Sequence, residues 1–339
     1  MKIWIDILTP KQLLFSEEIV EKLGKNHSIL CTSRHYHEVE ELAKIRKFKV
    51  KFVGKHGKEK RSKLILSNER MQKLTPIIAN FAPDLVLSFA SPEAARISFG
   101  LGINHYVFCD SPHADAVMRL TIPLIQKLFI PKIISKQEFS KFGIDKKNII
   151  SYNAIDASVT IKRKIMNTKF NFDKKIGKKN ILIRLEEKYA SYAEKSSRTD
   201  KIIDEIIKKF HNENILILAR YKEQMNHFKK LYGNKIKIFE MKFDGRQLLK
   251  DTDLFIGSGG TMTAEAALSG VPTISFNAIP NRIEEFLVKR KLVLRETSSK
   301  KITKLIDSIF SGSNKKNYKN VECILEKMEN PVNVLLKYI

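Results

Sequence analysis

The stretch from Asp253 to Ser275 constrains the fold more than any other part of this 339-residue chain. It begins with the apolar run Leu254–Ile256, which is typical of a strand buried in a parallel sheet. Glycines at positions 257, 259 and 260 follow, and they let the backbone turn sharply and approach a ligand closely. A helix is expected over Thr261–Ser269, with Thr261 as its N-cap and a glycine and a proline after its end. The pattern predicts one strand–turn–helix–strand unit of an α/β sheet.

A glycine turn that leads into a helix presents free N–H groups and the positive end of the helix dipole, which suits a phosphate or diphosphate. Glu265 lies one turn into this helix, at a position that a capping box would not use. Its carboxylate can accept hydrogen bonds from ribose hydroxyls, or it can be a solvated glutamate that favours the dipole. The sequence leaves both interpretations open. Neither the Gly-Lys-Ser/Thr of a P-loop nor an early G-x-G-x-x-G is present.

The charge of the chain is strongly positive, with 62 lysines and arginines against 37 aspartates and glutamates. Such an excess favours nucleic acid or an anionic membrane as a partner. However, the lysines are spread over every expected helix, and no arginine-rich arm or RNA-binding aromatic signature occurs. We therefore expect solvated helix faces and no nucleic acid partner. An anionic diphosphate substrate, or a lipid phosphate at a membrane surface, would also be attracted by this charge.

Three features of the sequence favour a cytoplasmic protein. No run of about 18 apolar residues is present that would cross a membrane. The first six residues form a strand pattern that contains an acid, which does not fit a signal peptide. The three cysteines are odd in number and lack metal-type spacing, which indicates reduced thiols. A peripheral contact with an anionic membrane surface stays open.

Strands and helices alternate with short connections over residues 1–156, which predicts a first doubly wound parallel sheet. The most apolar stretch, Leu120–Ile130, is expected to be a core helix that runs into a strand, with membrane contact as the alternative. The expected strands are Ile3–Ile7, His27–Cys31, Val50–Val53, Asp84–Ser88, His105–Phe108, Ile130–Ile134 and Ile149–Tyr152. The expected helices between them are Lys11–Leu23, Glu38–Ile45, Lys63–Phe81 and Glu93–Phe99.

The loop after the fifth of these strands carries the most promising polar groups, because ligands of doubly wound sheets bind beyond the carboxyl ends of the strands. Asp110 and His113 lie three residues apart there, so either can act as a general base toward an acceptor hydroxyl. The alternative is a helix cap at Asp110 or Ser111 with an exposed His113. The pair His35 and His37 has a metal-like spacing, but no carboxylate or cysteine set accompanies it, and no metal site is expected.

A lysine-rich segment with little periodicity over residues 157–179 is interpreted as the linker between two domains. A second strand–helix alternation follows over residues 180–320, and a helix is expected over residues 321–339. Arg184 and Arg220 end the first two strands of this half, so both are expected at the edge that carries the glycine turn. Their planar donors suit diphosphate oxygens, with surface ion pairs as the alternative.

The pattern Gly257-Ser-Gly-Gly-Thr-x-x-x-Glu265 with Gly270-x-Pro272 resembles the nucleotide-sugar motif in the second domain of GT-B-fold proteins. These include the glycosyltransferase of peptidoglycan lipid synthesis and the UDP-N-acetylglucosamine 2-epimerases. The resemblance implies two Rossmann-like domains that face a cleft, with the last helix packed back on the first domain. It also implies that Glu265 holds the ribose and that the diphosphate is held by the turn residues Ser258, Gly259, Gly260 and Thr261.

The whole chain is similar to a family of archaeal and bacterial proteins, domain of unknown function 354. The similar stretches are Trp4-Ile-Asp-Ile, Gly54-Lys-His-Gly, Phe81-Ala-Pro-Asp-Leu, Asp110-Ser-Pro-His-Ala, Arg184-Leu-Glu-Glu-Lys-Tyr-Ala-Ser-Tyr192 and Ala219-Arg-Tyr-Lys-Glu-Gln224. Two positions depart from the pattern of this family. Gln12 stands where a histidine is frequent, which weakens a catalytic scheme built on the first loop, and Ala264 stands where the pattern has an arginine before the glutamate.

These resemblances imply an enzyme that transfers a glycosyl group from a nucleotide-diphosphate sugar, without a metal or a further cofactor, to a polar or lipid-linked acceptor. The second domain would stabilise the diphosphate leaving group through N–H donors and Arg184, and Asp110 or His113 would activate the acceptor. A nucleotide-sugar 2-epimerase shares the donor site and is the alternative enzyme. A basic binding protein that has kept the fold without the chemistry is the alternative of another class.

Overall fold

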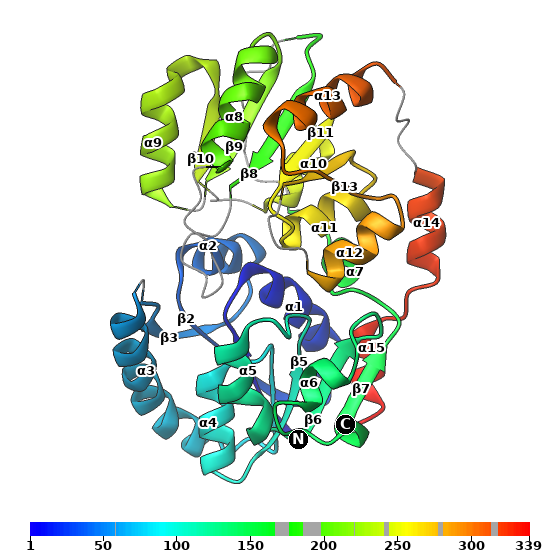
Figure 1. Cartoon of the computed structure of the whole chain (residues 1–339). Coiled ribbons are helices and arrows are strands. Elements are labelled where there is room, and N and C mark those ends of the chain that lie inside the picture. The colour runs from blue at the N-terminus through cyan, green and yellow to red at the C-terminus, as the bar shows by residue number, and fades with distance from the viewer. Residues whose placement is uncertain are drawn as a thin grey trace. The chain divides into compact units, whose positions relative to one another are not determined.

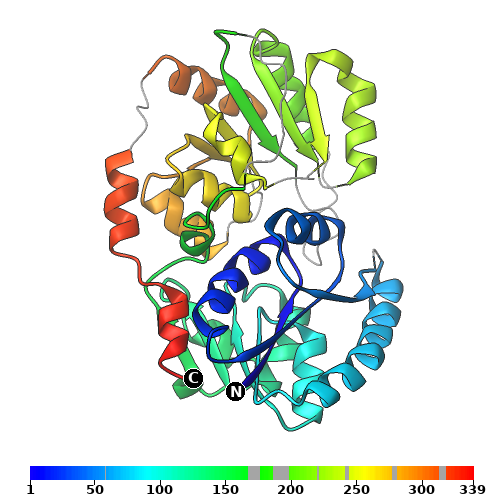
Figure 2. The same ribbon diagram turned by 180° about the vertical axis from the view of Figure 1, so that it is seen from behind.

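The structure is a computed structural model, and it describes residues 1–57, 59–166, 176–185, 198–219, 221–240, 244–276, 281–312 and 318–339. The chain divides into two compact units (Figure 1 and Figure 2). The first comprises Met1–Arg163 and Met328–Ile339, and the second comprises Lys164–Lys327. Each unit is built on its own parallel sheet, so the two doubly wound sheets that the strand–helix alternation predicts are confirmed.

The sheet of the first unit has, within the described residues, seven parallel strands in the order β3-β2-β1-β4-β5-β6-β7. The strand order changes direction between β1 and β4, which is the switch point where doubly wound sheets bind ligands. The strands are β1 (Lys2–Ile7), β2 (Ser28–His35), β3 (Lys51–Lys55), β4 (Leu85–Ser88), β5 (Asn104–Phe108), β6 (Lys127–Pro131) and β7 (Ile149–Tyr152). The helices are α1 (Pro10–Leu23), α2 (His37–Arg46), α3 (Lys60–Phe81), α4 (Pro92–Gly100), α5 (Asp115–Thr121), α6 (Gln137–Ser140), α7 (Ala157–Thr160) and α15 (Pro331–Leu336).

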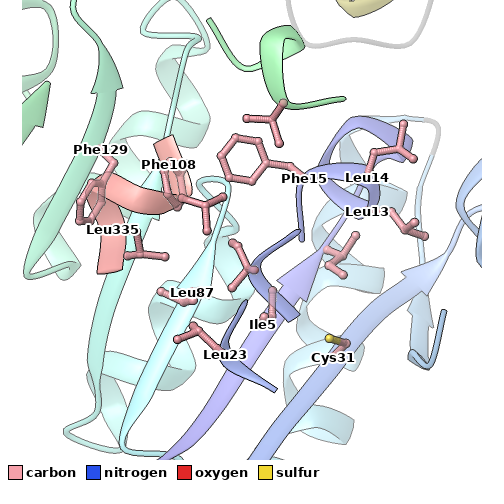
Figure 3. Packing of buried hydrophobic residues seen from close by; sticks show 14 of the residues in the cluster. Ile5, Leu13, Leu14, Phe15, Leu23, Cys31, Leu87, Phe108, Phe129 and Leu335 are labelled. Carbon is pink, nitrogen blue, oxygen red and sulfur yellow. The ribbon is translucent and has the colours of Figure 1, made fainter. Parts of the chain in front are cut away.

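Strand β1 is buried on both faces, and its alternating side chains separate the two helix layers of the first unit. Ile3 and Ile5 belong to the cluster that includes residues of α1, α2 and α15. Figure 3 shows Ile5 in this cluster with residues of α1 and with Leu335 of α15. Trp4 points to the other face, where it packs with residues of α3 and α4. Asp6 has the same parity as Trp4, so its carboxylate enters the α3 side of the sheet, where it is completely buried.

The apolar stretch before β6 differs from the prediction. Helix α5 ends at Thr121, a 3₁₀ turn follows over Ile122–Leu124, and strand β6 begins at Lys127 and ends at Pro131. The expected core helix over 120–130 and the expected strand over 130–134 are therefore wrong. The reason is Pro123, which lacks the N–H that a continuing helix needs. The strand is buried on both faces, so its sequence lacks the alternation of apolar and polar residues that would distinguish a strand from a helix.

The sheet of the second unit has, in the part that the structure describes, six parallel strands in the order β10-β9-β8-β11-β12-β13. The strands are β8 (Asn180–Arg184), β9 (Asn214–Ala219), β10 (Lys237–Glu240), β11 (Leu254–Gly257), β12 (Thr273–Ser275) and β13 (Leu294–Arg295). The helices are α8 (Arg198–Lys209), α9 (Lys222–Tyr232), α10 (Arg246–Lys250), α11 (Thr261–Leu268), α12 (Arg282–Lys289), α13 (Ser299–Phe310) and α14 (Tyr318–Glu326). Isoleucines of β8, β9 and β11 form the centre of its core.

The end of the chain forms two helices where one helix over 321–339 was expected. Helix α14 ends at Glu326, and α15 begins at Pro331 with Asn330 as its N-cap, whose side chain accepts from the N–H of Val332 at 2.8 Å. The proline restricts the residue before it to non-helical backbone, so the chain must break there. Val332 and Leu335 are completely buried in the core of the first unit. None of the described helices is long and apolar enough to cross a membrane.

Candidate functional site

The glycine turn after β11 has the backbone that the sequence predicts, with one difference. Gly259 has a φ of +75°, a conformation that favours glycine over every other residue. Gly260, and not Thr261, is the N-cap of α11, and the backbone oxygen of Gly260 accepts from the N–H groups of Thr263 (3.0 Å) and Ala264 (3.3 Å). Thr261 is thus the first helical residue. A glycine N-cap places no side chain over the first N–H groups of the helix, which have no partner within it.

Close packing at Gly257 and a hydrogen bond from Asn281 also constrain this turn. A Cβ on Gly257 would lie 2.6 Å from the Phe255 ring and 2.7 Å from Thr263 Oγ1, so a side chain does not fit there. Asn281, the N-cap of α12, donates from Nδ2 to the backbone oxygen of Gly259 at 3.0 Å and accepts from Glu284 N at 2.9 Å. Asn281 was not singled out in the sequence, because an asparagine before a helix signals only a cap.

Glu265 lies in the second turn of α11 and is only 7% exposed. Its interpretation as a solvated glutamate is therefore wrong. The structure thus places a buried acid one helical turn beyond a glycine turn, at the carboxyl edge of β11.

Arg184 ends β8 and is 4% exposed, so its interpretation as a surface ion pair is wrong. Its Nη1 donates to the backbone oxygens of Leu218 (3.4 Å) and Ala219 (3.1 Å) at the end of β9. Since β8 lies between β9 and β11, the guanidinium is at the same edge of the sheet as the glycine turn. Arg220 lies outside the described residues.

In the first unit, Asp110 follows β5 and shares an ammonium group with a second carboxylate. Lys11 Nζ, from the first turn of α1, lies 2.7 Å from Asp110 Oδ2 and 3.0 Å from Asp156 Oδ2. Ser111 Oγ donates to the other oxygen of Asp110 at 2.8 Å, and Tyr152 OH donates to Asp156 Oδ1 at 2.6 Å. The side chain of Asp110 is 21% exposed and that of Asp156 is 1% exposed, so Asp110 is the member that a substrate can reach.

The two carboxylates have pKa values shifted in opposite directions. Burial alone would raise the pKa of Asp110, but the Lys11 ammonium outweighs it and holds this pKa below its ordinary value. Burial raises the pKa of Asp156, and the negative charge of Asp110 adds to this rise against the opposing effect of Lys11. Neighbouring groups whose pKa values are pushed apart are typical of acid–base sites. Asp110 is the ionised member and Asp156 is the member that more readily keeps a proton.

His113 and the histidines near β2 complete the predicted residues. The N-cap of α5 is Ala114, so the alternative of a helix cap at Asp110 or Ser111 is wrong. The side chain of His113 is exposed, and partial desolvation lowers its pKa, while Asp110 and Glu138 oppose this shift. His35 Nδ1 lies 2.8 Å from Glu40 Oε1. No three His, Cys, Asp or Glu side chains with metal-ligand geometry come together in the described ranges.

Lys11 and Asp156 were missed by the sequence analysis as members of the site. A lysine in the first turn of a helix carries no signal of its own among 62 basic residues. Asp156 ends the Tyr152-Asn-Ala-Ile-Asp156 segment, which resembles a turn of GT-B chains, and that resemblance was the available signal. Lys11 and Asp156 are 145 residues apart, so only the fold brings them together.

The two doubly wound sheets define a two-domain, Rossmann-like fold of the GT-B class. The chain belongs to the family described as protein of unknown function (DUF354), whose model matches residues 1–338. The uncharacterized protein MJ0665 from Methanocaldococcus jannaschii is 26% identical over 319 residues, which cover 91% of each chain.

Two solved structures illustrate the likeness of the fold. The UDP-GlcNAc 2-epimerase from Neisseria meningitidis, bound to UDP-GlcNAc, has a TM-score of 0.75 at 16% identity over 100% of this chain and 99% of its own. The spinosyn rhamnosyltransferase SpnG, in complex with thymidine diphosphate, has a TM-score of 0.64 at 10% identity over 99% of both chains.

Proposed function

We propose that this protein binds a nucleotide-diphosphate sugar through its second unit and transfers the glycosyl group to an acceptor. The observation that carries the proposal is the buried Glu265 one turn beyond the glycine turn. The positive φ of Gly259 and the glycine N-cap leave the first N–H groups of α11 open to an anion. Glu265, 7% exposed, lies one helical turn beyond these N–H groups, where its carboxylate can accept hydrogen bonds from the hydroxyls of a ribose attached to the diphosphate.

Arg184 would contribute to the donor site by charge. Its guanidinium is buried at the carboxyl edge of β8, next to β11, where a diphosphate would lie. Donors that are fixed before the reaction stabilise charge as it develops on the leaving diphosphate. Its bonds to Leu218 and Ala219 fix the guanidinium, so this stabilisation needs no rearrangement.

Asp110 would act on the acceptor. Lys11 holds it ionised at neutral pH, so it can accept a hydrogen bond from the attacking hydroxyl and take its proton in the transition state. The acceptor is proposed to be a polar or lipid-linked molecule. The protein is proposed to be cytoplasmic, since Cys31, Cys109 and Cys323 are all unpaired.

A nucleotide-sugar 2-epimerase is the second candidate, and the arrangement of Asp110 and Asp156 favours it. Epimerisation moves a proton off and onto one carbon, which requires an acid and a base near the sugar. Two carboxylates around one ammonium, with opposite pKa shifts, could supply both. The epimerase structure with a TM-score of 0.75 supports the same candidate. Product analysis separates the two: transfer gives a new glycoside, whereas epimerisation gives an altered amino sugar.

Calorimetry on Glu265→Gln tests the donor site. The variant keeps a good helix former but removes the charge that would bind the ribose. We expect UDP to bind more weakly by about 1.5–3 kcal/mol, the usual range for a hydrogen bond to a charged group. Pyrophosphate, which has no ribose, should lose much less. Glu285→Gln on the exposed side of α12 is the control and should change neither ligand. Equal losses for UDP and pyrophosphate would show that Glu265 acts through folding, and the ribose role would be abandoned.

A further inference from the structure

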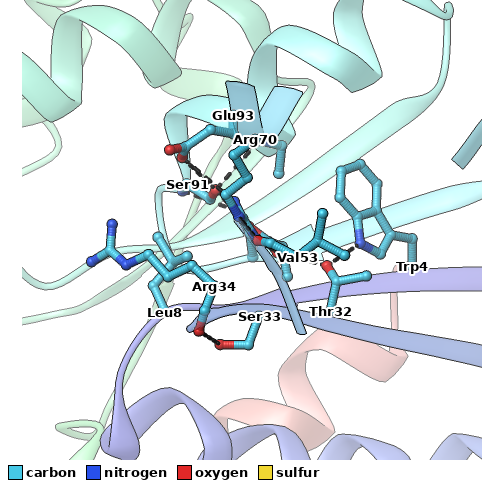
Figure 4. Close-up of polar contacts among 12 residues, drawn as sticks. Trp4, Leu8, Thr32, Ser33, Arg34, Val53, Arg70, Ser91 and Glu93 are labelled. Atoms are coloured by element: carbon cyan, nitrogen blue, oxygen red, sulfur yellow. Dashed lines mark hydrogen bonds and ion pairs between the residues drawn. The ribbon is translucent and has the colours of Figure 1, made fainter. Parts of the chain in front are cut away.

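The carboxyl edge of β1 in the first unit holds a buried network in which two arginines have different surroundings (Figure 4). Arg70 is completely buried and donates to both oxygens of Asp6, at 2.6 and 3.2 Å, and to the backbone oxygen of Val53 at 3.0 Å. The same carboxylate accepts from Thr32 Oγ1 and Ser91 Oγ at 2.7 Å each. Both carboxylate oxygens of Asp6 therefore already accept hydrogen bonds from groups of the protein.

Arg34 is the second arginine, and it lies one residue before the end of β2. Its Nε is buried and has no hydrogen-bond partner among the described residues. The nearby carboxylates already have partners: Asp6 binds Arg70, and Glu93 accepts from Ser67 Oγ at 3.0 Å. Figure 4 shows the Arg34 guanidinium pointing away from Arg70. A buried guanidinium donor without an acceptor is uncommon in proteins, and a bound oxyanion would supply the acceptor.

Two more nitrogen-bearing side chains lie near Arg34: His56, just after β3, and Lys63, in the first turn of α3. His35 of β2 pairs with Lys55 of β3, so Arg34 and His56 flank this pair at the same edge of the sheet. Partial desolvation lowers the pKa of the exposed His56 to about 4, and the positive charges of Arg34 and Lys63 act in the same direction. The field of each cation therefore reaches the imidazole, which comes from the end of β3, while Lys63 comes from the first turn of α3. The histidine ring is neutral at neutral pH and can donate one N–H.

Two glycines explain why this loop lies so close to α3. Gly54 has a φ of +76°, and a Cβ on it would lie 2.8 Å from Cβ and Cγ of Arg70. A Cβ on Gly57 would lie 2.3 Å from the backbone nitrogen of Lys63. Both positions exclude any larger residue, so the Gly54-Lys-His-Gly57 segment is built to hold His56 against the start of α3. The proposed donor and catalytic residues of the nucleotide-sugar reaction make no use of this segment.

We propose that Arg34, His56 and Lys63 form a binding site for a phosphate group at the carboxyl edge of β2 and β3. This edge, beside the switch point, is where doubly wound sheets bind ligands. A guanidinium contacts two oxygens of a phosphate at once, and the imidazole and ammonium groups can serve the others. Glu59, the N-cap of α3, does not fill the site, because its side chain accepts from the backbone of its own capping box. The proposal does not rest on nucleotide-sugar binding by the second unit.

The test is calorimetric titration of the full chain with inorganic phosphate, in a Gly260→Val background that blocks the glycine turn of the second unit. Arg34→Met should weaken phosphate binding about ten-fold or more, as expected for loss of hydrogen bonds from a charged group. His56→Ala should weaken it several-fold, and because His56 is exposed this variant should fold even if Arg34→Met does not. Arg119→Met removes the same charge from an exposed pair with Asp115 and should leave the affinity within about two-fold.

A second titration with glycerol 3-phosphate distinguishes a free phosphate ion from a phosphate ester as the ligand. If the ester binds with the same dependence on Arg34, the site takes a phosphate monoester of a larger molecule. If only inorganic phosphate shows this dependence, the site takes the free ion. Absence of saturable phosphate binding, or equal losses in Arg34→Met and Arg119→Met, would overturn the proposal. A failure of UDP binding in the wild type would leave it untouched, because the two sites are on different units.

Discussion

Arg70 Nη2 donates to Asp6 Oδ1 at 2.6 Å, and this pair joins residues 64 positions apart in the sequence. Both side chains are completely buried. Burial alone would raise the pKa of Asp6, but Arg70, Thr32 and Ser91 outweigh it and lower this pKa below its ordinary value. The pair ties α3 to β1, and through Thr32 and Ser91 it also ties β2 and the start of α4. The switch point of the first unit is thus fixed by charge as well as by apolar packing.

Arg70→Met should destabilise the first unit by about 3–5 kcal/mol, because it removes the positive partner of the buried Asp6 carboxylate. The double variant Asp6→Asn/Arg70→Met should recover part of this loss. Urea unfolding followed by fluorescence measures the effect on this unit, since the single tryptophan, Trp4, donates to Thr32 within the same network. Arg119→Met serves as the exposed control. Equal stabilities of Arg70→Met and the control would contradict a structural role for the pair.

The stability of the first unit should fall between about pH 6.5 and pH 3 because of His105. Burial lowers the pKa of this histidine from 6.5 to about 3, while Asp6 opposes the shift, and its two ring nitrogens contact Ser88 Oγ (2.9 Å) and Ser98 Oγ (3.1 Å). Below pH 6.5 His105 binds a proton in the unfolded chain but stays neutral in the folded state, so acid favours unfolding. At pH 4.5, two pH units below the unfolded pKa, the loss is about 2.7 kcal/mol.

His105→Gln removes the titrating group and should reduce the loss of stability at acid pH. The comparison is urea unfolding of wild type and variant at pH 7 and pH 4.5, again followed by Trp4 fluorescence. The variant will be less stable at pH 7, but its difference between the two pH values should be smaller by about 2.7 kcal/mol. If the pH dependence of stability is unchanged in the variant, groups other than His105 cause the loss of stability at acid pH.

Gly54→Ala should cost much more stability than Gly102→Ala. Both glycines have positive φ, +76° and +68°, so the backbone strain is similar, at about 1–2 kcal/mol. A methyl group on Gly54 would also meet Cβ and Cγ of Arg70 at 2.8 Å, whereas nothing lies within 4 Å at Gly102. The contact should add about 1–3 kcal/mol of overpacking at Gly54. If denaturant midpoints of the two variants shift equally, the close approach of β3 to α3 at Gly54 is not present in solution.

Asp110→Asn should lower turnover about 100-fold or more, while the binding of nucleoside diphosphate persists, because Asp110 is proposed to act on the acceptor. His113→Ala tests the other base candidate of the same loop. Asp115→Asn is the control, since its carboxylate forms an exposed pair with Arg119. The readout is product formation together with nucleotide affinity by calorimetry. Unchanged turnover in both Asp110→Asn and His113→Ala would place the base elsewhere in the first unit.

The alternation of strands and helices was predictable because most of these elements have a clear period or a clear stop. Helix α1, for example, begins at a Thr9-Pro10 cap and ends at a glycine, and the sequence predicted it to within one residue. The segment 120–134 was not predictable, since a strand buried on both faces has no period. At the glycine turn the N-cap preference of Thr261 was misleading: Gly260, whose backbone is extended, is the N-cap, and Thr261 is the first helical residue.

The sites divide in the same way. Ser258–Glu265 and Asp110 are local in sequence, and their chemistry is visible in the order of residues. Lys11 with Asp156, and Arg70 with Asp6, require strands and helices far apart in sequence to be assembled first. A buried donor such as Arg34 Nε has no sequence signature, because only the folded structure shows that no acceptor among the described residues lies beside it.

The first unit consists of two segments of the chain that are separated by the whole second unit, and this affects how it folds during synthesis. The core of this unit contains Val332 and Leu335 from α15, which follow all of the second unit in the chain. Burial of two such side chains is worth about 3–6 kcal/mol. During synthesis the core of the first unit therefore stays incomplete until residues 328–339 have followed the second unit out of the ribosome. Any chain that stops before α15 leaves the apolar surface under Val332 and Leu335 exposed, and quality control can recognise it by that surface.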